Sequence, residues 1–144
     1  MTAVASLSNF IPDPPPEALA TADQLHAAFS KLVAALPGQP QRPMDLARAV
    51  NADKSVAHRL VTAISKGAHL GMLITIPGPA PLLEIIQAAR RLGVPATLCA
   101  ETTEAVGRFD SLVQELAGDR ATFDAMMSEW VEDARSHVDT AARQ

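Results

Sequence analysis

The eleven prolines of this chain are clustered: four lie within 1–16, three within 37–43, three within 77–81, and the last is Pro95. Proline disrupts a helix interior but is tolerated in a first turn or a loop. The stretches between the clusters are rich in alanine and leucine, which have the highest helix propensities. The sequence therefore predicts an all-α fold in which proline-rich segments separate the helices. The first cluster has no periodicity, so 1–16 is predicted to be a disordered or loosely docked arm.

Apolar residues recur at helical spacing from about residue 25 onward. Thr21 and Gln24 resemble a capping box, which starts many helices, and the pattern after it ends at a proline–glycine pair. Two shorter helices are predicted at about 43–50 and 54–66, with Gly67 ending the second. Three helices are thus expected before residue 67.

The C-terminal part predicts two more helices. Gly118 ends the first, and Asp119 is placed to cap the second. We expect these helices to form a hairpin, and we expect residues 106–138 to provide the seam of a homodimer. The two apolar stripes consist of Val106, Phe109, Leu112, Val113 and Leu116, and of Phe123, Met126, Met127, Trp130, Val131, Ala134 and Val138.

Residues 72–100 allow two interpretations. The runs LITI and VPATLCA flank the helical pattern PLLEIIQAARRLG, and together they could form a β-α-β unit. Parallel sheets are normally built from several such units, and no second one is visible. Helical or irregular structure is the preferred interpretation, with short β segments as the alternative.

Charge is distributed unevenly along the chain, whose net charge is −4. Residues 42–66 hold five basic and two acidic groups, whereas 101–144 hold four basic and ten acidic groups. A basic segment inside an acidic chain is typical of a DNA-binding module. We therefore divide the chain into a DNA-binding domain at 17–76 and a helical packing or dimerisation region at 77–144.

Several classes of function are not expected. Cys99 is the single cysteine, which excludes an internal disulfide and a cysteine-based zinc site. No metal-like spacing relates the four histidines, and no nucleophile is paired with a base, so neither a cofactor nor an enzyme activity is predicted. The start has no signal-peptide pattern and no stretch is apolar enough to span a membrane, so a cytoplasmic protein is expected. The histidines are His26, His58, His69 and His137.

The predicted helix 54–66 is amphipathic. With about 100° of turn per residue, its polar side chains fall within an arc of about 140°. Asp53 is placed to cap this helix, Asn51 can adopt a left-handed turn conformation, and Ala47 is small enough for a close helix crossing. The polar arc consists of Lys54, Ser55, His58, Arg59, Thr62, Ser65 and Lys66.

The pattern L-A-x-x-V-N-x-D-K-S-x-A-x-R-L over 46–60 resembles the helix-turn-helix of bacterial transcriptional regulators. KSVAHRL is similar to the recognition helices of winged-helix regulators of the IclR kind, although IPGPAP follows where a wing would lie. The resemblance implies binding to double-stranded DNA. By it, Lys54, Ser55, His58 and Arg59 would face bases, Arg42 and Lys66 would lie nearer phosphates, and Thr62 would share the same face.

Two functional hypotheses follow. The first is a sequence-specific DNA-binding transcriptional regulator that dimerises through its C-terminal helices. The second is a helical interaction or sensor module in which residues 43–66 serve as scaffold. The sequence names no effector.

Overall fold

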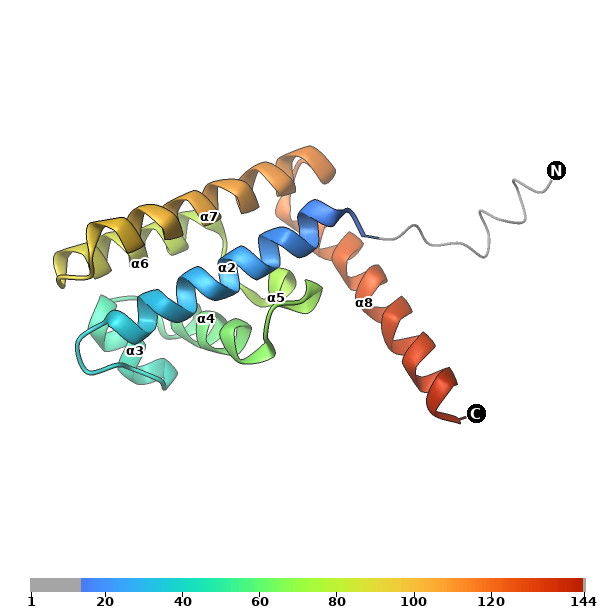
Figure 1. The fold of residues 1–144 in the computed structure, drawn as a ribbon, viewed down its shortest axis with the longest axis horizontal. Coiled ribbons are helices and arrows are strands. Elements are labelled where there is room, and N and C mark those ends of the chain that lie inside the picture. Colours follow the sequence, from blue (N-terminus) through green and yellow to red (C-terminus); the bar gives the residue numbers. More distant parts are fainter. Residues whose placement is uncertain (1–13, 144) are drawn as a thin grey trace.

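The computed structural model describes the backbone of residues 14–143 and the side chains of residues 14–132. Within that range the chain is helical and contains no strand, so the all-α prediction is confirmed. The helices are α2 (Pro16–Ala35), α3 (Pro43–Val50), α4 (Lys54–Lys66), α5 (Leu70–Thr75), α6 (Pro79–Arg91), α7 (Ala96–Leu116) and α8 (Arg120–Arg143) (Figure 1).

Prolines begin most of these helices. Pro16, Pro43 and Pro79 occupy first helical positions, and Pro95 immediately precedes α7. The missing N–H of proline has no helical partner at such a position, and its fixed φ suits a helix start. Because α2 begins at Pro16, Thr21 lies inside the helix and is buried, so the predicted capping box is wrong. Of the predicted arm, residues 1–13 lie outside the described residues.

All of the regular secondary structure in 72–100 is helical. LIT belongs to α5, whose C-cap is Ile76, PLLEIIQAARR to α6, and ATLCA to the first turns of α7. The β-α-β alternative is therefore wrong. A stretch of four residues is too short for its apolar pattern to distinguish a strand from a helix.

One hydrophobic core joins the two regions that the sequence suggested. Its buried members run from Ala18 in α2 to Met127 in α8. The long helix α2 packs mainly along α7, and α6 also packs on α7 (Figure 1). The boundary predicted at 76/77 therefore does not separate two cores.

The helix α8 leaves the end of α7 at a steep angle (Figure 1). The predicted cap is present, because Asp119 Oδ1 accepts a hydrogen bond from Thr122 N at 2.8 Å. After that turn α8 packs chiefly on α5 and makes little contact with α7. The two predicted helices and their short connection are present, but the helices do not pack along each other, so the predicted hairpin is wrong. None of the described helices is long and apolar enough to cross a membrane.

Candidate nucleic-acid interface

A left-handed turn connects α3 to α4. Asn51 has φ 54° and ψ 49°, and the N–H of Ala52 donates to Ala47 O at 2.9 Å, which closes the end of α3. Asparagine tolerates this conformation better than most residues that carry a Cβ. The three-residue connection predicted from the sequence is therefore observed, and it turns the chain sharply between two packed helices.

Small side chains lie where α3 and α4 pack together. Ala57 is fully buried and Ala47 is 8% exposed, with Leu46, Val50 and Leu60 buried beside them. A methyl group in place of a longer side chain allows two helix backbones to approach closely. Asp53 precedes α4 as predicted, although its side chain makes no capping hydrogen bond.

The opposite face of α4 is polar and largely open to solvent. Lys54, Ser55, His58 and Lys66 are exposed, whereas Thr62 is partly buried. Arg42 is exposed immediately before α3. Within the described side chains, Arg42, Lys54 and Lys66 are not in ion pairs. The charges are therefore available to an anionic partner.

Arg59 differs from the other predicted site residues. Its Nε donates to Thr75 O at 3.1 Å and its Nη2 donates to Ile76 O at 3.2 Å, both at the end of α5. At 100° per residue, Arg59 lies at the edge of the polar arc nearest the buried Ala63. This geometry makes Arg59 a link between α4 and α5, rather than a side chain that extends freely toward a base.

Arg120 is a second link to α5, and the sequence reasoning missed it. Its Nη2 donates to the carbonyls of Leu73, Ile74 and Ile76 at 3.0, 3.1 and 2.6 Å. The guanidinium also pairs with Asp124 at 2.8 Å and lies 5.1 Å from the centre of the Phe109 ring. One signal was available: a cation in the first turn of a helix is unfavourable for the helix dipole, which suggests that it serves another partner.

The histidines that the structure describes outside α4 have local structural roles. His26 Nε2 lies 3.0 Å from Ile64 O and joins α2 to α4, while His69 Nδ1 accepts from Gly71 N at 3.0 Å and caps α5. His137 lies outside the described side chains. Cys99 is buried, and Arg90 and Arg91 are exposed in the last turn of α6. Among described residues, no three potential metal ligands come together.

Comparisons with protein families, with curated proteins and with solved structures find no match to this chain. The functional argument therefore rests on the geometry of α3, α4 and their surroundings.

Proposed function

We propose that this protein is a sequence-specific DNA-binding transcriptional regulator that reads DNA with α4. The observation that carries the proposal is the combination of the left-handed turn at Asn51, the alanine-lined packing of α3 on α4, and an open polar face on α4. A helix-turn-helix needs all three, because its second helix must be held firmly while its outer face enters the major groove.

The residues of this face have distinct expected roles. Lys54, Ser55 and His58 lie in the first half of α4, the part that contacts base edges in a helix-turn-helix. Arg42 and Lys66 lie before α3 and at the end of α4, where they suit phosphate contacts. Thr62 is partly buried, and Arg59 positions α4 against α5.

We also propose that the protein is a homodimer, because one such unit offers a small contact with DNA and regulators commonly pair to read two half-sites. Much of the predicted dimer seam is instead buried inside the monomer, since Phe109, Phe123 and Met127 are fully buried. The proposed contact is therefore α8 beyond its first turns, where Met126 and Val131 are only partly buried. A dimer mass by light scattering at micromolar concentration is expected, and a monomer at high micromolar concentration would argue against it.

The test of DNA binding begins with duplexes selected by the protein from a random pool. Binding followed by fluorescence anisotropy should weaken steeply with salt, because phosphate contacts release counterions. Lys54→Ala should weaken binding at least severalfold, and Lys66→Ala should also reduce the salt dependence. Lys31→Ala removes an exposed lysine from α2 and is the matched control, with binding unchanged.

Two results would overturn the proposal. One is the absence of selected, salt-dependent binding, and the other is equal loss in the Lys54 and Lys31 variants. Either would favour the alternative of a helical interaction module.

A further inference from the structure

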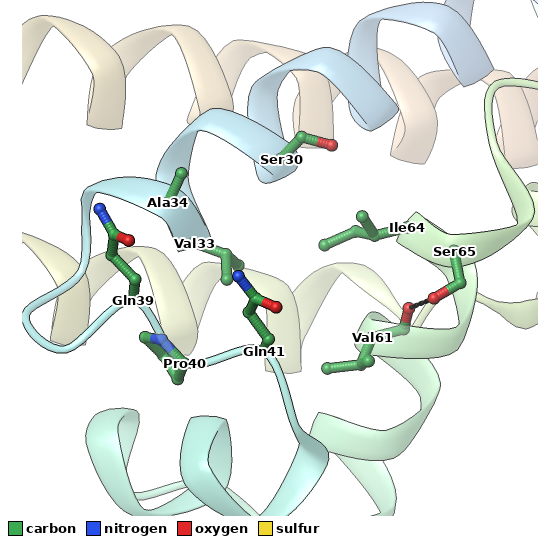
Figure 2. Close-up of a pocket in the computed structure, with 9 residues that line it drawn as sticks. All are labelled: Ser30, Val33, Ala34, Gln39, Pro40, Gln41, Val61, Ile64 and Ser65. Carbon is green, nitrogen blue, oxygen red and sulfur yellow. Dashed lines mark hydrogen bonds between the residues drawn. The ribbon is translucent and has the colours of Figure 1, made fainter.

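A cavity of about 380 Å³ lies between α2 and α4 (Figure 2). Its walls are the C-terminal half of α2, the loop after it, and the second half of α4. Figure 2 shows Val61 and Ile64 projecting from α4 toward the loop, and Gln41 extending from the loop into the space between α2 and α4. This volume is at the small end of the range for ligand pockets.

The lining of this cavity defines the chemistry of a ligand. Val33, Val61 and Ile64 supply apolar surface, and no charged side chain is among the lining residues. Gln39 and Gln41 contribute side-chain amides that have no hydrogen-bond partner within the described chain. An ion would lose its hydration here without gaining a partner charge, so the cavity suits an uncharged molecule.

The two serines of the lining are closed to an occupant. Ser30 Oγ has no hydrogen-bond partner among described residues, but it is buried, so an atom in the cavity does not reach it. Ser65 on the facing helix donates to Val61 O at 2.9 Å and is satisfied within the protein. The glutamine amides are therefore the polar groups that the cavity offers to a ligand.

The loop that forms one wall of the cavity contains two residues with left-handed backbone conformations. Gly38 and Gln39 have positive φ values, 79° and 46°, and the buried Pro40 follows them. A non-glycine residue in this region is uncommon and is held there by its surroundings. A preformed wall lowers the entropy that a ligand loses on binding, because less of the protein must become ordered.

We propose that this cavity binds a small uncharged organic molecule with an apolar body and one hydrogen-bonding end directed at the side-chain amide of Gln41. Because Val61 and Ile64 belong to α4, an occupant would contact α2 and α4 together and would hold one against the other. The consequence for regulation rests on the proposed DNA-binding function: such a ligand would change the affinity of α4 for DNA.

The probe for this site is the neutral fluorophore 6-propionyl-2-(dimethylamino)naphthalene, which has an apolar body and a carbonyl acceptor. Titration of the full chain should give a saturable blue shift with one site per chain. Gln41→Trp should fill the cavity and weaken binding at least tenfold. Gln87→Trp, an equal change at an exposed position of α6, should bind like the parent.

Gln41→Leu tests the polar end. It removes the amide at nearly constant side-chain volume and should weaken probe binding severalfold. Unsaturable binding, or equal binding by the parent and Gln41→Trp, would overturn the site. Unchanged affinity in Gln41→Leu would overturn the assignment of Gln41.

Repeating the titration with selected DNA present separates this inference from the proposed function. If ligand and DNA are coupled, DNA must change probe affinity by the same factor as the probe changes DNA affinity. Probe binding without any DNA binding would refute the proposed function and leave the cavity site intact. DNA binding without saturable probe binding would refute the cavity site alone.

Discussion

Ala57 is fully buried on the apolar side of α4, the helix on which α3 packs, so a longer side chain has no free space there. We predict that Ala57→Glu strongly destabilises the fold. Overpacking alone costs about 1–3 kcal/mol, and a buried charge without a partner adds to that cost. Denaturant unfolding gives the measurement. Ser55→Glu introduces the same side chain at an exposed site on the same helix and should change stability by less than about 0.5 kcal/mol.

Comparable stability in the two glutamate variants would contradict the close packing of α3 and α4, which is the structural basis of the proposed DNA-binding unit.

Asp119 is a second residue with a measurable local effect. Hydrogen bonds from the backbone N–H and the hydroxyl of Thr122 stabilise its carboxylate and hold its pKa below the ordinary value. A lowered pKa in the folded state gives stability that is present above about pH 4 and is lost as the pH falls below that value. We predict that Asp119→Ala is less stable than the parent at pH 7.

This difference should shrink as the pH falls below about 4, because the aspartate of the parent becomes progressively protonated. Thermal melts of both proteins across that range measure it. A gap between the two melting temperatures that is constant with pH would show that the carboxylate charge contributes nothing to the cap.

At the scale of elements, α5 has six residues and depends on its neighbours. Arg59 from α4 and Arg120 from α8 both donate to carbonyls at its C-terminal end, and they share Ile76 O as an acceptor. We predict that Arg120→Ala lowers the free energy of unfolding by about 1.5–3 kcal/mol, the range for hydrogen bonds that involve charged groups. Arg59→Ala should cost less, because Arg59 is exposed.

The double variant should be non-additive by about 0.5 kcal/mol or more, since residues that share a partner are coupled. Arg91→Ala, which removes an exposed arginine from the end of α6, is the control. Additive effects of Arg59→Ala and Arg120→Ala would show that α5 does not couple α4 to α8.

The sequence predicted those elements whose ends are determined locally. The bounds of α3 and α4 follow from Pro43, Asn51 and Gly67, each of which acts on its own turn of chain. The start of α2 was missed because a capping pattern at Thr21 was preferred to a proline at the first helical position. The form of α5 depends on arginines 17 and 44 residues away from Ile76, which no local pattern reports.

The same distinction applies to the candidate site. The open polar face of α4 follows from the helical period, so most of its residues could be named from the sequence. The hydrogen bonds from Arg59 to α5 could not be predicted. The helical period gives only the direction of a side chain around the helix axis, and not which element lies in that direction.

At the scale of the whole molecule, α2 is shared between the proposed DNA-binding unit and the rest of the fold. Its buried face packs mainly on α7, which begins 20 residues beyond the predicted boundary at 76. We predict that a fragment of residues 17–76 does not fold cooperatively, whereas the full chain does. Circular dichroism melts compare the two.

A cooperative melt of fragment 17–76 would show that the contact between α2 and α7 is dispensable.

The sharing of α2 also bears on inheritance. A genetic crossover at 76/77 would join the N-terminal half of the core from one parent to the C-terminal half from another. The two halves would then not have been selected to pack together. Substitutions within 96–116 can then affect the packing of α2, whose last residue lies 61 residues before the start of α7. The unit that can be exchanged between proteins is accordingly the whole shared core from α2 to α8, so drift in α7 and in α2 should be correlated among descendants of this chain.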